Sequence, residues 1–176
     1  LPPPGLATAR SLWPAAGERY AQALAIKPDM HTAACNWGNA KAVEAWAVAS
    51  IDLAEARRLW SMAGERYAQA LAIKRDKHEA AYNWGTALHY EARAVAPTDL
   101  IEARRLWNAA EVLYAEAFAI APDKHKVANS WGLVLATAAQ AVAPTDLTEA
   151  LRLWTAAGER YAQALAIKPE IGRAHV

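Results

Sequence analysis

Aromatic and glycine residues recur along this chain at a constant interval of 47 residues. A fixed interval of this size is typical of stacked-repeat proteins, in which each unit buries its apolar face only against its neighbours. Such arrays usually present an extended binding surface and seldom contain a catalytic cleft. The interval therefore predicts a binding scaffold without naming its partner. The recurring residues are Trp13, Trp60, Trp107 and Trp154; Trp37, Trp84 and Trp131; Tyr20, Tyr67, Tyr114 and Tyr161; and Gly38, Gly85 and Gly132.

The composition favours helices, because alanine is abundant and β-branched residues are sparse. Lys and Arg number 19 against 18 Asp and Glu, so the net charge of +1 favours neither nucleic acid nor acidic lipid. No apolar run approaches the roughly 18 residues of a membrane-spanning helix. The single cysteine, Cys35, allows no internal disulfide, and nothing suggests a zinc site. We therefore expect no nucleic-acid or membrane partner, no metal and no cofactor; the compartment stays open, with the cytoplasm favoured.

The copy from His78 to Asp123 shows how one repeat is built. Small and apolar residues three or four apart form one face of its first helix. Pro97 ends that helix, because proline has no amide proton and disfavours the helical conformation in the residue before it. Asp99 with Glu102 three residues later resembles a capping box and starts the second helix, from Leu100 to about Ala121.

Applied to the whole chain, this pattern predicts an all-α helical-repeat solenoid of about seven helices spanning residues 1–170. A shortened lead helix at about residues 14–27 starts at Pro14, after an irregular segment from Leu1 to Ala9. Three antiparallel pairs follow, at about 31–74, 78–121 and 125–168. Residues 171–176 break the repeat at once, and we interpret them as a sequencing-adapter artefact. Since the chain starts in mid-repeat without a methionine, we expect a fragment of a longer protein.

One family shares the spacing of these small and aromatic residues. The chain resembles the tetratricopeptide repeat (TPR) family in the pattern Trp84-Gly85…Leu88, then Ala110-x-x-x-Tyr114-x-x-Ala117…Pro122. The repeat unit of that family has about 34 residues. The longer unit of this chain has additional residues around the Ala96-Pro97-Thr98 turn. The resemblance covers residues 15–170 and implies a right-handed superhelix whose first helices line a concave groove. It also implies a protein–protein interaction scaffold that binds a peptide or a helix in that groove.

Groove positions that differ between copies are the candidates for ligand contact, although they could equally be exposed polar positions without a ligand. Rigid amphipathic rings in the middle copy suggest a contact centre. Asn36 and Asn83 resemble groove asparagines of the family, which could bond a peptide backbone or instead a neighbouring helix. The candidate peptide-binding residues are Asn36, Asn39, Glu79, Tyr82, Asn83, Thr86, His89, Tyr90, Lys126 and Asn129.

A sharper hypothesis from the family is the carboxylate clamp that holds the acidic C-terminus of chaperones. Asn39, Asn83 and Lys126 fall on three of its positions, but Cys35 and Ser130 occupy two positions that should be basic. Losing these cations removes most of the charge-assisted hydrogen bonding to a terminal carboxylate. We therefore expect no clamp.

Two departures from the repeat admit two interpretations each. Val112 and Leu113 replace a Glu-Arg pair that should be solvated in the other copies, so either the core is wider there or an apolar patch is exposed. Trp46 stands where the other copies have Arg93 and Gln140. It covers the lead helix or serves as a surface anchor.

No group of residues predicts catalysis. His89 near Glu91 and Tyr90 has no nucleophile beside it. The repeated Asp-x-His pairs lie on successive repeats, too far apart for one metal ion. Arginines of the second helices follow glutamates closely, which favours a solvated face of mixed charge over a basic stripe. The periodic tryptophans are explained as core residues, which argues against base stacking.

Two other functions remain open at this point. The repeats could be the regulatory or targeting array of a larger enzyme whose catalytic domain is missing from the fragment. A repeat RNA binder is disfavoured by the charge. Apolar faces at the truncated ends also predict self-association, which light scattering at high concentration would contradict if it found a clean monomer.

Overall fold

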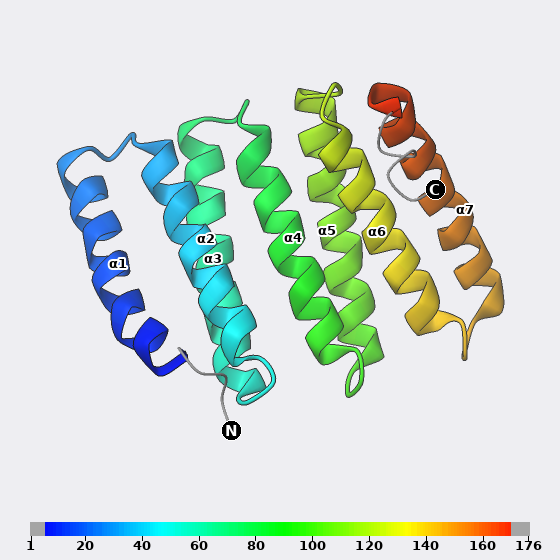
Figure 1. The fold of residues 1–176 in the computed structure, drawn as a ribbon, viewed down its shortest axis with the longest axis horizontal. Helices are drawn as coiled ribbons and strands as arrows, with labels where there is room; N and C mark the ends of the chain where they lie inside the picture. The colour runs from blue at the N-terminus through cyan, green and yellow to red at the C-terminus, as the bar shows by residue number, and fades with distance from the viewer. Residues whose placement is uncertain (1–5, 170–176) are drawn as a thin grey trace.

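The computed structural model describes residues 6–169, and this range contains seven α-helices and no strand. Successive helices run in opposite directions and follow one another along the array (Figure 1). The all-α class, with a lead helix followed by three helix pairs, is confirmed. Residues 171–176, which we assigned to an adapter, lie outside the described range. The helices are α1 (Leu6–Ile26), α2 (His31–Val48), α3 (Leu53–Ile73), α4 (His78–Val95), α5 (Leu100–Ile120), α6 (His125–Val142) and α7 (Leu147–Ile167).

The prediction for the lead helix is wrong at its start. Helix α1 begins at Leu6 and not at Pro14, so it is not shortened: it has 21 residues, as do α3, α5 and α7. Proline inside a helix removes one hydrogen bond, here the one to the carbonyl of Arg10. The alanine, leucine and arginine residues before Pro14 have high helix propensity, which offsets that loss.

The second helices of the three pairs begin at aspartate caps, as the sequence predicts. The side chains of Asp52, Asp99 and Asp146 each accept a hydrogen bond of 2.9 Å from the backbone N–H three residues later. The glutamates at those positions use their carboxylates differently from a capping box. Glu102, for example, binds Arg105 at 2.7 Å on the outside of α5. The outer face therefore carries paired charges.

Within each pair, a glycine of the first helix receives a tyrosine ring of the second. A Cβ atom built on Gly38 would lie 2.7 Å from the ring of Tyr67, and one on Gly132 would lie 2.8 Å from Tyr161. Gly85 meets Tyr114 at 3.2 Å. The absence of a side chain is what allows the two helices to approach so closely. The glycine and tyrosine series of the sequence are thus one packing device.

The first helices of the pairs form the inner layer of a curved array. Each second helix packs on its own first helix, α3 and α5 also pack on the first helix that follows, and α1 packs on α2. Contacts also join α2 to α4 and α4 to α6, but none joins α1, α3, α5 and α7 to one another within the described residues. Figure 1 shows α3 and α5 behind α2, α4 and α6. Because the first helices lie closer together, the array bends toward them, and they line its concave side.

The tryptophans are less uniformly buried than the sequence suggests. Trp60 and Trp107 are each 3% exposed and Trp131 is 7% exposed, so these belong to the core. Trp13, Trp37 and Trp84 are only partly buried. Trp154 is 40% exposed, contrary to the prediction, because no following helix packs on α7 among the described residues. Apolar side chains of α7 near it are exposed too, so the self-association of this face stays a prediction.

Candidate functional site

The concave side contains three adjoining cavities between neighbouring first helices. One, which we call the α2–α4 pocket, has a volume of about 340 Å³. The other two have volumes of about 320 Å³, between α2 and α4, and about 420 Å³, between α4 and α6. Asn83 lines all three and therefore joins them into one groove. The α2–α4 pocket is lined by Asn39, Ala42, Val43, Trp46, Trp60, Tyr67, Asn83, Thr86, Ala87 and Tyr90.

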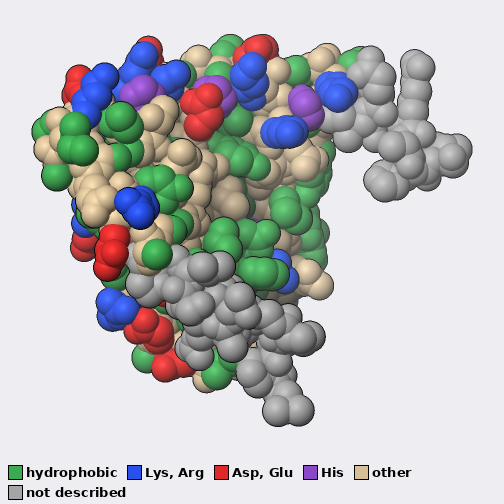
Figure 2. Space-filling view, turned by 60° about the vertical axis from the view of Figure 1, so that its left-hand side comes forward, with side chains coloured by type: hydrophobic (Ala, Val, Ile, Leu, Met, Phe, Trp, Pro, Cys, Tyr) green, Lys and Arg blue, Asp and Glu red, His purple; other side chains and the backbone are tan. Residues whose placement is uncertain are grey.

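Charged and histidine side chains gather along one edge of the molecule, with apolar side chains and a hollow below them (Figure 2). The 420 Å³ cavity lies at this edge, since His78, His125, Lys124 and Lys126 line it together with Glu79. The groove is thus basic at the edge where the first helices begin. In the α2–α4 pocket, by contrast, the lining residues are apolar or uncharged polar.

Most of the candidate residues line this groove. His89 and Asn129 do not line any of the three cavities. Asn129 is exposed on α6. The candidates that line a cavity are Asn36, Asn39, Glu79, Tyr82, Asn83, Thr86, Tyr90 and Lys126.

The assignment of His89 to the groove surface is corrected by its burial. The side chain is 4% exposed, and its Nδ1 atom is buried without a hydrogen-bond partner. Burial, with Arg93 nearby, lowers the pKa of the imidazole to about 4. His89 lies four residues after Gly85, which puts it on the face of α4 that packs against other helices. The sequence contained this signal, but the polarity of histidine obscured it.

Two groove residues hold the hydroxyl groups of the buried tyrosines. Tyr67 donates a hydrogen bond of 2.8 Å to Oδ1 of Asn39, and Tyr114 and Thr86 share one of 2.9 Å. Burial raises the pKa of both tyrosines, so the hydroxyls keep their protons. Since Oδ1 of Asn39 is occupied, its Nδ2 group is left as a donor facing the groove.

Asn83 presents the complementary group. Its Nδ2 atom donates a long hydrogen bond of 3.8 Å to Sγ of Cys35 on α2, which leaves Oδ1 as an acceptor. Burial raises the pKa of the Cys35 thiol, so the sulfur stays neutral. Both interpretations of this asparagine therefore have support, because it bonds a neighbouring helix and also lines the groove.

The side chain of Tyr82 is held in place by contacts within the fold. Its hydroxyl lies 3.2 Å from Oγ of Ser130 on α6, and its ring meets that of Tyr114 edge-on at 5.7 Å. Replacing Tyr82 with alanine would remove both contacts. Its effect on binding would therefore be mixed with an effect on stability.

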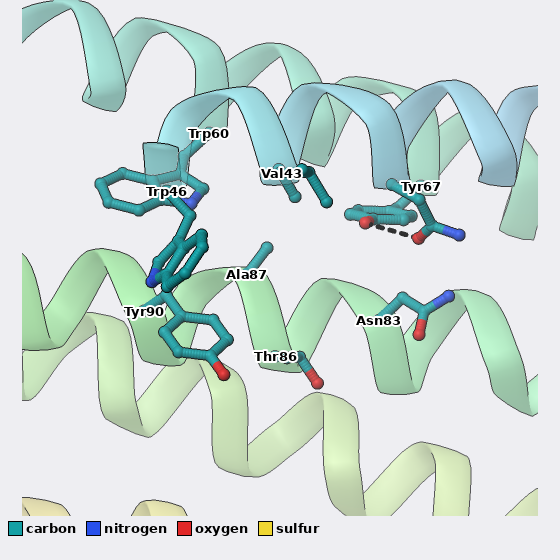
Figure 3. A pocket seen from close by; sticks show the side chains of 10 residues that line it. Val43, Trp46, Trp60, Tyr67, Asn83, Thr86, Ala87 and Tyr90 are labelled. Atoms are coloured by element: carbon teal, nitrogen blue, oxygen red, sulfur yellow. Dashed lines mark hydrogen bonds between the residues drawn. The ribbon is translucent and has the colours of Figure 1, made fainter. Parts of the chain in front are cut away.

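Trp46 is the groove residue whose role the sequence left open. Its ring lies 6.5 Å from that of Tyr90 on α4, and 64% of its surface is exposed. Figure 3 shows both rings at one end of the α2–α4 pocket, with Asn83 and Tyr67 at the other. The signal was its departure from Arg93 and Gln140 in the other copies.

Val112 and Leu113 differ in their environments, so each of the two interpretations holds for one of them. Leu113 is 9% exposed and belongs to the core, whereas Val112 is 66% exposed. In α3 the position of Leu113 is held by Arg66, whose guanidinium lies 4.0 Å from the centre of the Trp37 ring. The arginine is thus partly buried over an aromatic ring, and our expectation that this position is solvated in the other copies is wrong.

Several other kinds of site can be checked directly. Within residues 6–169, no group of three or more His, Cys, Asp and Glu is placed to hold a metal ion. In the same range no helix has the length and hydrophobicity needed to cross a membrane. Asn39 and Lys126, two of the clamp positions, line different cavities.

Comparison with known proteins adds no assignment: the chain matches no protein-family model and no curated protein sequence. The fold places the chain in a structural class: it is an all-α array of consecutively packed helix pairs with a concave groove.

Proposed function

We propose that this chain is a protein–protein interaction scaffold of the TPR type that binds an extended peptide along its concave side. The observation that carries the proposal is the continuous groove formed by three cavities that share Asn83. Concave pockets lined by apolar side chains and a few placed polar groups are the usual form of ligand sites. The framework that builds the groove repeats, whereas its lining differs from copy to copy, as recognition requires.

The polar groups of the groove suit a peptide main chain. Asn39 offers an N–H donor and Asn83 offers a carbonyl acceptor on the facing helix. A peptide unit carries one acceptor and one donor, so it can satisfy both side chains at once. Such bonds provide affinity with little sequence preference, and the flanking cavities would then provide selectivity.

A displayed library of random peptides, selected against the whole chain, tests this proposal. Replacement of Asn83 by alanine should weaken the selected peptides at least tenfold, or about 1.4 kcal/mol, because Asn83 lines every part of the groove. Within residues 6–169 its side chain forms one hydrogen bond, the long one to Cys35, so helicity should persist.

Ile101→Ala is the matched control, since Ile101 is 84% exposed on α5, away from the groove. Calorimetric titration measures both variants. The proposal fails if the selection enriches no peptide, or if affinity is unchanged in Asn83→Ala.

A further inference from the structure

Two alanines line the α2–α4 pocket at positions where the next copy has larger side chains. They are Ala42 of α2 and Ala87 of α4. One repeat later, at the α4–α6 junction, the corresponding residues are His89 and Val134, which are 4% and 1% exposed. The same framework thus carries small side chains at the α2–α4 junction and larger ones at the next junction.

The α2–α4 pocket has aromatic and apolar walls that are exposed in the described part of the chain. Trp46 and Val43 are 64% and 56% exposed, and Tyr90 is 39% exposed. Large apolar side chains of a monomer that surround a cavity often mark a binding site. Among the described residues, no Asp, Glu, Lys, Arg or His lines the pocket, so this lining offers no partner to an ionised group. Burying an unpaired charge there would be strongly unfavourable.

We propose that the α2–α4 pocket receives one uncharged aromatic side chain of the bound peptide, whose main chain crosses Asn39 and Asn83. This inference rests on the proposed function and specifies the residue that the groove selects. The ring lies against Trp46 and Tyr90. The two asparagines at the other end fix the direction in which the side chain enters.

N-acetyl-tyrosinamide is the probe that tests this, because it has an uncharged aromatic ring and an amide on each side. Titrated into the ¹⁵N-labelled chain, it should cause saturable chemical-shift changes at residues of the pocket. The N-acetyl amides of aspartate and lysine should cause none there. Equal binding of the charged amides would overturn the inference.

The substitutions Ala42→His and Ala87→Val introduce the larger side chains found at the corresponding positions of the α4–α6 junction, so they should fill the pocket. The double variant should fold, since the framework accommodates both residues one repeat later, and it should bind the probe at least tenfold more weakly. Trp46→Ala provides a second test that is insensitive to core packing, because the side chain is largely exposed. Its matched control is Gln140→Ala, at the corresponding exposed position of α6.

Unchanged affinity in both the double variant and Trp46→Ala would exclude the pocket. Failure of this inference and failure of the proposed function can be told apart with the selected peptides. If the peptides still require Asn83 but tolerate the filled pocket, the groove binds peptides and the aromatic assignment is wrong. If the selection enriches no peptide while the probe binds, the pocket holds a small aromatic ligand and the scaffold proposal is wrong.

Discussion

At the scale of single residues, the repeated positions and the unrepeated ones differ in how well they can be predicted. Gly38 and Tyr67 recur in every pair, and the structure explains both by one close approach. His89 occurs once, and the sequence indicated its burial only through its spacing of four residues from Gly85. Adjacent residues of a helix point in directions about 100° apart, so neighbours in sequence can belong to different environments. Residues that recur in every copy could therefore be assigned to packing from the sequence. For a residue that occurs in one copy, the structure was needed to show its environment.

The glycines provide a matched pair of substitutions. Gly38→Ala should destabilise the chain by about 1–3 kcal/mol, because the new methyl group overlaps the ring of Tyr67, which is 1% exposed and cannot move aside. Gly158→Ala should stabilise it by about 0.5–1 kcal/mol, because nothing lies within 4 Å and alanine favours the helix. Urea denaturation measures both. Destabilisation by both substitutions would show that backbone effects dominate over the contact with Tyr67.

His89 should make stability depend on pH in a defined window. The pKa is about 4 in the folded chain and about 6.5 when unfolded, so the unfolded state binds the proton first as pH falls. The stability that the chain has with neutral His89 is therefore fully present above pH 6.5. As the pH falls to 4, the free energy of unfolding decreases by about 3 kcal/mol.

Comparison with His89→Ala, which restores the residue found in the other copies, isolates this effect from the carboxylates. The difference in unfolding free energy between the two proteins should change across the window. A constant difference between pH 7 and pH 4 would contradict the low pKa.

At the scale of elements, helix ends are the part that the sequence predicts best. Asp52, Asp99 and Asp146 cap α3, α5 and α7 with the geometry expected of them. The failure at α1 has a local cause. Pro14 is a good first-turn residue and also a tolerable interior one when strong helix formers precede it, and the pattern alone does not distinguish the two.

Arg57 connects three of these elements. It lies 3.3 Å from Glu91 of α4 and 2.8 Å from Glu102 of α5. Burial raises the pKa of the Glu91 carboxyl even with Arg57 beside it. Arg57→Met should therefore cost about 1–3 kcal/mol, because it leaves a buried carboxylate unpaired.

Glu91→Ala, which introduces the residue of the third copy, Ala138, should remove much of that cost when combined with Arg57→Met. A double-mutant cycle by denaturation measures the coupling, which we expect to be about 1 kcal/mol or more. Strict additivity would mean that solvent already screens the pair, since Arg57 is partly exposed.

At the scale of the whole molecule, the order of the helices follows from the period, but the hollow between α2 and α4 does not. The hollow is lined by Ala42 and Ala87, which come from different copies and lie side by side only in the folded array. Comparing this pair of residues with His89 and Val134 became possible once the structure had shown which positions face each other. Trp46 and Tyr90 were visible in the sequence as unusual residues, but their contact across two helices was not.

The pattern of contacts has a mechanical consequence. Every helix is held only by its near neighbours along the chain, and no contact bridges the array from one end to the other within the described residues. A pulling force applied to the two ends would therefore pass through each junction in series, as it does through the turns of a coil spring. An occupant of the α2–α4 pocket, in contact with both helices, would stiffen the coil at that turn.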